Sequence, residues 1–422
     1  MNEETQKKWA EKATNSVADY FPNITDGNNW LECKELLGCA LECIEQTEIY
    51  QIKTTSSSIL LTLTALYLHK QADNANALIL FERSLEIDRY LVGESHSDYA
   101  STINNIASVY DSQGNYEKAL SLYKEALQLT GIVAGKKSLH YGQTLNNIGL
   151  IYNEKGEYDI ALNCFQEALS LVEENEGKQH IDYATILSNM ALLHQSKGNY
   201  KEASDLHKKV LKIDEQTLGK QSIEHANNLN NLAVLYLSNE EYEKALPLLE
   251  ETLEITKNIL HEQHPEYALV LSNIAALYQC REEYKKALSF CQTALSIYAQ
   301  TLGKQHPEYA SNLSNLASLY EVQGEQQKAQ ELYQEAIGIY ESTLGKQNPD
   351  YLTIIGNLAL IHQEQGQYEK ALPLYKKVLN IFINVLDGQH PNIEIIKENY
   401  EDCLEQYHEK IDNEQGNPEK MG

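Results

Sequence analysis

The sequence predicts an all-α solenoid built from stacked pairs of antiparallel helices. An asparagine recurs every 42 residues between positions 105 and 399, and a fixed period of this kind indicates a repeat array. Each unit contains two stretches with the apolar spacing of an amphipathic helix, and no unit contains a strand pattern. Because the units of an array stack, the asparagines should form a row along one surface.

The unit at 267–308 shows how each helix is recognised. Its first stretch, YALVLSNIAALYQ, carries Leu271, Ile274 and Tyr278 on one helical face. Its second stretch, YKKALSFCQTALSIYAQTL, repeats the same spacing. Each unit should therefore be a helical hairpin.

Short polar turns separate these helices. In the LGKQHPEY connector between units, Gly303 should end one helix and Pro307 should begin the next. Within a unit, the turn often holds a glycine, which tolerates the left-handed conformation that closes a helix. These glycines are Gly114, Gly156, Gly198, Gly324 and Gly366.

Columns of small residues predict close packing between the helices. The second helices carry Ala119, Ala161, Ala203, Ala245, Ala287, Ala329 and Ala371. The first helices carry Ala107, Gly149, Ala191, Ala233, Ala275, Ala317 and Ala359. A larger side chain here should destabilise the contact by about 1–3 kcal/mol. The core around these columns is expected to be filled by Tyr116, Tyr158, Tyr200, Tyr242, Tyr284 and Tyr368.

The register of the repeats divides the chain into segments. The first repeat is degenerate, because Leu63 stands where the asparagine belongs. In order, the expected segments are an N-terminal helical cap (1–56), the degenerate repeat (57–98), seven 42-residue units (99–392), a C-terminal capping helix (393–411) and a disordered tail (412–422).

Composition excludes several classes of function. The chain has 34 basic and 61 acidic residues, a net charge of −27, so it should avoid nucleic acid and anionic membranes and favour neutral or basic partners. No secretion signal opens the sequence, and its longest apolar stretch (59–68) is too short to insert across a membrane. The seven cysteines form no CxxC pair, which is typical of a reducing compartment, and we expect a cytoplasmic protein.

No motif predicts catalysis, a cofactor or a metal site. GIVAGKKS (131–138) is one residue short of a phosphate loop and follows no strand. HEQH (261–264) is not the HExxH zinc motif, and Cys39 and Cys43 lack further metal ligands nearby. We therefore expect a protein that is not an enzyme and holds neither cofactor nor metal.

Together these columns resemble the tetratricopeptide repeat. From about 57 to 404 the chain follows [LI]-N-x-[AG]-x-x-[YH]-x-x-x-G-x-Y-x-x-A-L-x-x-[YF]-x-x-A-L, and its 42-residue period and LGKQHP connector are similar to the kinesin light chain-like subclass. The resemblance implies a right-handed superhelix whose first helices line a concave groove, where ligands of the family usually lie. The segments 7–22 and 30–46 resemble the region before such repeats in bacterial STAND/NB-ARC-type signalling NTPases.

That geometry assigns the groove-facing positions. They lie at −4, −1, 0, +3, +6 and +7 relative to the asparagine of each unit. The candidate peptide-binding amides are Asn105, Asn147, Asn189, Asn231, Asn273, Asn315 and Asn357, with Asn104, Asn146 and Asn230 beside them. The acidic members are Asp111, Glu154, Glu321 and Glu364. No lysine or arginine is expected in this lining, whereas the family's carboxylate clamp needs one to hold an acidic C-terminus.

An asparagine amide both donates and accepts, so a ladder of them can pair with the backbone of an extended peptide. The leading hypothesis is a non-catalytic scaffold that binds an extended, neutral-to-basic peptide or partner protein in the groove. Leu150, Leu192, Val234 and Leu360 would line its specificity pockets.

Three alternatives stay open. The asparagines could join neighbouring repeats only. The chain could be the sensor or regulatory region of a split or truncated signalling NTPase. It could also self-assemble through its ends, so the sequence does not predict an oligomeric state.

Overall fold

The structure, a computed structural model, describes residues 2–23, 29–385 and 391–415. These residues form nineteen helices and no strand, which confirms the predicted all-α class. Helices α1 (Glu3–Tyr20) and α2 (Trp30–Ile49) precede the repeats, and α19 (Pro391–Gln415) follows them. None of the described helices is long and apolar enough to cross a membrane.

Eight helix pairs lie between these ends. The first helices of the pairs are α3 (Thr55–Lys70), α5 (Ser97–Ser112), α7 (Leu139–Glu154), α9 (Ile181–Ser196), α11 (Ile223–Ser238), α13 (Pro265–Cys280), α15 (Pro307–Val322) and α17 (Pro349–Glu364). The second helices are α4 (Asn74–Leu91), α6 (Tyr116–Val133), α8 (Tyr158–Asn175), α10 (Tyr200–Thr217), α12 (Tyr242–Leu260), α14 (Tyr284–Thr301), α16 (Gln326–Thr343) and α18 (Tyr368–Val385).

Each helix packs on its neighbours in the sequence, first within its pair and then on the next pair. The small columns explain this closeness, since all seven alanines of the second helices are fully buried. In the first-helix column the six alanines are buried as well. Its one glycine, Gly149, lies where an added Cβ would come 2.7 Å from the ring of Phe165. The prediction of tight columns is confirmed.

The expected tyrosine core was only partly right. Tyr116 is buried, but the others of that column, Tyr158, Tyr200, Tyr242, Tyr284 and Tyr368, are half-buried. They are the first residues of their helices, where one side of the ring still faces solvent. The fully buried tyrosines belong to other positions, namely Tyr123, Tyr333, Tyr340, Tyr351 and Tyr375.

The helix ends follow the predicted turn chemistry. The five turn glycines have φ between 68° and 79°, in the left-handed region. Pro265, Pro307 and Pro349 each stand at the first position of a helix. The last helix, α19, continues past position 411 to Gln415 and so takes in the start of the segment expected to be disordered, while 416–422 lie outside the described residues.

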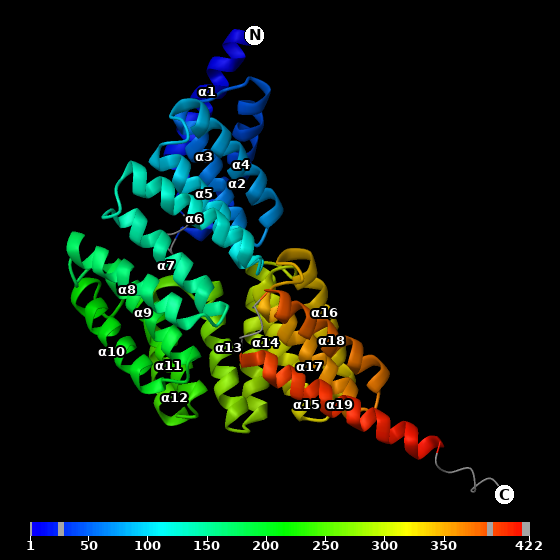
Figure 1. The fold of residues 1–422 in the computed structure, drawn as a ribbon. Helices are drawn as coiled ribbons and strands as arrows, with labels where there is room; N and C mark the ends of the chain where they lie inside the picture. The colour runs from blue at the N-terminus through cyan, green and yellow to red at the C-terminus, as the bar shows by residue number, and fades with distance from the viewer. Residues whose placement is uncertain (1, 24–28, 386–390, 416–422) are drawn as a thin grey trace, which may run out of the picture.

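The array curls back on itself. Figure 1 shows α14 and α16, in yellow and orange, returning to the blue and cyan N-terminal helices. Hydrogen bonds join residues 236 positions apart along the chain, so the superhelix completes a turn within the described residues. This closure was not predicted, and it shapes the candidate site.

Candidate functional site

The repeating asparagines lie on the first helices, as their spacing requires. Asn105, Asn147, Asn189, Asn231, Asn273 and Asn357 are half-buried, and Asn315 is exposed. Of their predicted neighbours, Asn146 and Asn230 are buried and Asn104 is half-buried. The ladder amides are therefore partly accessible, whereas Asn146 and Asn230 beside them are buried.

Two members of this ladder are bonded to the neighbouring repeat. The Nδ2 of Asn189 donates to Oδ1 of Asn146 at 2.8 Å, and the Nδ2 of Asn273 donates to Oδ1 of Asn230 at 2.7 Å. The acceptor is in each case the asparagine one position before the ladder position of the preceding unit. These amides join adjacent repeats by hydrogen bonds, which is the structural role that the sequence left open as an alternative.

Other ladder members are not used in this way. Among the described residues, no hydrogen bond joins the amide of Asn231 or Asn315 to another side chain or to the backbone. In the repeat before each of them, the position equivalent to Asn146 and Asn230 is held by Ser188 and by Ser272. These serines are shorter than asparagine and form hydrogen bonds with other partners. The ladder thus contains both bonded and unbonded amides.

A shallow pocket of about 500 Å³ lies between α13 and α15 on the predicted face. Its lining comes from the positions assigned to the groove: Ala276, Gln279, Cys280, Asn315, Ser318 and Val322, with Glu282 and Tyr284 at one end. Gln279 donates to the hydroxyl of Ser318 at 2.9 Å across the two helices. An exposed amide beside small polar and apolar groups can receive a peptide backbone and a side chain together.

The four predicted acids lie in different surroundings. Burial and the charge of Glu154 raise the pKa of Asp111 to about 7. Burial, followed by the charge of Asp350, raises the pKa of Glu154. Burial also raises the pKa of Glu321, although Tyr333 donates to its Oε2 at 3.2 Å and opposes the shift. Glu364 is exposed and accepts a bond from Gln326 at 3.3 Å.

Sequence reasoning missed a second set of acids. Glu266, Glu308 and Asp350 stand in the first turns of α13, α15 and α17, where a carboxylate is favoured by the helix dipole. The pKa of Glu308 is raised by burial and then by the charges of Asp350 and Glu266. A 42-residue column of acids was visible in the sequence, but only closure of the superhelix brings one member, Asp350, near Glu154.

The closure itself rests on hydrogen bonds that we call the seam. Nε2 of His306 donates to the carbonyl of Lys70 at 3.2 Å, while its Nδ1 accepts from the backbone of Glu308 and caps α15. One repeat later, Nδ2 of Asn348 donates to the carbonyl of Ser112 at 3.1 Å. The two contacts have the same separation of 236 residues, so they are one interaction made twice.

Further contacts follow the seam. Asn74 donates to the carbonyl of Thr343 at 3.5 Å, and Lys34 donates to that of Thr301 at 3.4 Å. An added Cβ on Gly114 would lie 2.5 Å from the carbonyl oxygen of Gln347, so the backbones touch there.

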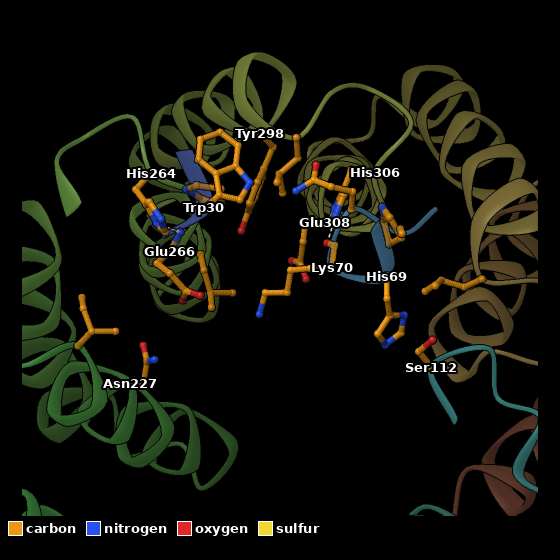
Figure 2. Close-up of a pocket in the computed structure, with 18 of the residues that line it drawn as sticks. Trp30, His69, Lys70, Ser112, Asn227, His264, Glu266, Tyr298, His306 and Glu308 are labelled. Carbon is orange, nitrogen blue, oxygen red and sulfur yellow. Dashed lines mark hydrogen bonds between the residues drawn. The ribbon is translucent and has the colours of Figure 1, made fainter. Parts of the chain in front are cut away.

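The seam encloses a second pocket, of about 560 Å³, which we call the seam pocket. Figure 2 shows its walls, with Trp30 and Tyr298 on one side and His69 and His306 on another. Burial and the charge of Lys70 lower the pKa of His264 to about 4, and burial lowers that of His306, so both are neutral at pH 7.

Lys70 corrects an expectation about the lining. It occupies the +7 position of the degenerate repeat, and Figure 2 shows its side chain reaching into the open middle of the seam pocket. The groove-facing set therefore includes one lysine, although none was expected there. It is supplied by the repeat that lacks the asparagine.

Among the described residues, no group of three or more His, Cys, Asp or Glu side chains is arranged to hold a metal ion. All seven cysteines are free thiols, and Cys39 and Cys280 are exposed.

Comparison with known proteins identifies the repeats. The tetratricopeptide repeat family model matches residues 56–130, 141–216, 182–258, 224–290, 266–342 and 350–411. The sequence has no match among curated proteins.

Three solved structures from different organisms match parts of this chain. The apo quorum sensor NprR from B. thuringiensis is 18% identical, with 74% of this chain and 85% of that one covered and a TM-score of 0.53. The putative kinesin light chain of Podosopora anserina is 23% identical, covering 48% and 95%, with a TM-score of 0.39. A STAND protein with a tetratricopeptide repeat sensor, PH0952 from Pyrococcus horikoshii, is 17% identical, covering 93% and 55%, with a TM-score of 0.48. At 18% identity, the likeness to the NprR structure concerns the fold alone.

Proposed function

Since the chain belongs to the tetratricopeptide repeat family, whose solenoids act as protein-interaction scaffolds, we propose that it binds an extended peptide, or an extended segment of a partner protein, in its concave groove. The proposed role is non-catalytic, and the contacts are the unbonded asparagines of the ladder. The observation that carries the proposal is the pocket between α13 and α15, lined by groove positions and by the exposed Asn315.

The charges of the groove suggest the class of peptide. Asp111, Glu154 and Glu321 stand six or seven positions after ladder asparagines, and burial is the largest cause that raises the pKa of each, so a nearby positive charge would stabilise their ionised forms. A basic ligand supplies that charge and a neutral one adds no repulsion, whereas an acidic one is repelled. The overall charge of −27 favours the same partners.

The two kinds of ladder asparagine allow a sharp test. Asn231→Ala with Asn315→Ala removes amides that have no partner among the described residues, whereas Asn189→Ala with Asn273→Ala removes amides that bond to Asn146 and Asn230. Binding to an array of extended peptides graded in charge should weaken in the first pair with no loss of stability. The second pair should lose stability by about 1 kcal/mol per bond. If the first pair binds as the wild type does, the ladder does not contact the ligand.

A further inference from the structure

We propose that the seam pocket is a subsite for one arginine or lysine side chain of a peptide bound in the groove, and that Lys70 occupies this subsite when no peptide is present. The inference rests on the proposed function and adds a site to it. The occupant is a single cationic side chain on a long aliphatic stem. The inference follows from the position of the pocket, the charges that face it, and its walls.

The pocket lies where a peptide in the groove would pass. It is lined by the first turns of α11, α13 and α15, including Asn227 and Leu269 at groove-facing positions. Its opposite wall is the end of α3, which the seam brings from the other turn of the superhelix. The seam pocket and the pocket at Asn315 thus lie at opposite ends of the same two first helices, α13 and α15.

Carboxylates dominate the charge of the pocket. Glu224, Glu266 and Glu308 face it, and Lys70 is the only lysine or arginine among the residues that line it. The histidines of the lining do not offset the acids, because burial lowers the pKa of His69, His264 and His306. Carboxylates therefore outnumber the ammonium groups of Lys70 and of Lys34, which lies over Trp30, so a cation at this place, whether that of Lys70 or of a ligand, improves the electrostatic balance of the pocket.

The walls suit the stem of a long basic side chain. Trp30 and Tyr298 supply aromatic surface, and Leu269 and Leu302 supply aliphatic surface. Trp30 already holds a cation, since Nζ of Lys34 lies 4.9 Å from the centre of its ring. Aromatic faces with carboxylates at the far end are the surroundings that arginine and lysine prefer when partly buried.

Lys70 is an independent sign that an ammonium group fits. Its side chain extends into the pocket beside Glu308, and its charge lowers the pKa of that acid against the other influences. No carboxylate of the described residues lies within ion-pair distance of its Nζ, and the residue is exposed, so the side chain can leave the pocket. A ligand cation must displace it, and Lys70 therefore lowers the affinity of the site.

The test measures binding of a fluorescent hexa-arginine peptide by anisotropy at physiological salt. Glu266→Gln and Glu308→Gln should each weaken binding about tenfold, as expected for a charge-assisted contact. Lys70→Gln should strengthen it by about three- to tenfold, because the built-in competitor is gone. None of these changes breaks the seam, since His306 donates to the main-chain carbonyl of Lys70.

Matched controls separate the subsite from the general charge of the protein. Glu250→Gln and Lys209→Gln make the same changes of charge on exposed positions of the second helices α12 and α10. At physiological salt both should alter affinity by less than about twofold, because distant exposed charges are screened.

The outcomes distinguish this inference from the proposed function. If the asparagine pair 231/315 loses binding while the seam-pocket variants behave like their controls, the groove binds peptide and the subsite does not exist. If Lys70→Gln weakens binding, Lys70 contacts the ligand and is not its competitor. Failure of the wild type to bind hexa-arginine at all contradicts the subsite, and neutral peptides on the array then decide the proposed function separately.

Discussion

At the scale of single residues, the backbone of His261 has a conformation that favours glycine, and glycine stands at the equivalent position of the neighbouring repeats. Its φ of 66° and ψ of 167° lie in a region used almost only by glycine, and the equivalent residues one repeat away are Gly219 and Gly303. His261→Gly should therefore raise the free energy of unfolding by about 1 kcal/mol, measured by urea denaturation. The reverse change, Gly303→His, should lower it. A destabilised His261→Gly variant would show that the imidazole makes a compensating contact.

Asp111 makes stability depend on pH. Its pKa is raised to about 7 in the folded chain, from about 3.8 when unfolded, so the folded state keeps a proton that the unfolded state releases. The stability that comes from this bound proton is fully present below the pKa of Asp111 in the unfolded chain. It is lost as the pH rises through the pKa of Asp111 in the folded chain. Because the side chain is partly exposed, Asp111→Asn should stabilise by only about 1–2 kcal/mol at pH 8, with the gain fading towards pH 4. A gain that is constant across pH would contradict the assignment.

At the scale of helices, the contact of α7 with α8 depends on a missing methyl group. Alanine normally stabilises a helix relative to glycine by about 1 kcal/mol. At Gly149, however, a Cβ would lie 2.7 Å from the ring of Phe165, which is fully buried and cannot move aside. Gly149→Ala should therefore destabilise by about 1–3 kcal/mol in thermal unfolding. Adding Phe165→Leu should recover part of the loss. Full stability of the single variant would mean that the helices can separate.

The sequence was sufficient to predict the helices because their causes are local. The 42-residue columns locate the buried alanines, the turn glycines and the helix-starting prolines, and each depends on residues close along the chain. The role of each asparagine was not predictable in this way. Asn189 forms a hydrogen bond to the preceding repeat because an asparagine stands at position 146. For Asn231 the equivalent residue is the shorter Ser188. The acids of the first turns could be read from the sequence, but it is the seam that makes some of them line a pocket.

At the scale of the whole molecule, the seam could not be predicted because it depends on small rotations summed over several repeats. Its strength can be tested with two glycines of one column. Gly114 and Gly198 both have left-handed φ, but only at Gly114 does an added Cβ meet the backbone of Gln347. Both alanine variants carry the same conformational penalty. Gly114→Ala alone should open the superhelix and raise the radius of gyration in small-angle X-ray scattering. Equal radii of gyration for the Gly114→Ala and Gly198→Ala variants would show that the backbone at the seam adjusts without opening the superhelix.

We propose that unbonded ladder asparagines contact an extended peptide in the groove. It is tested most directly by measuring the affinity of a basic extended peptide for the wild type, for Asn231→Ala/Asn315→Ala and for Asn189→Ala/Asn273→Ala. We expect the first variant to bind about tenfold or more weakly while unfolding like the wild type. Unchanged affinity in that variant, with destabilisation confined to the second, would contradict the claim and leave the ladder a structural feature.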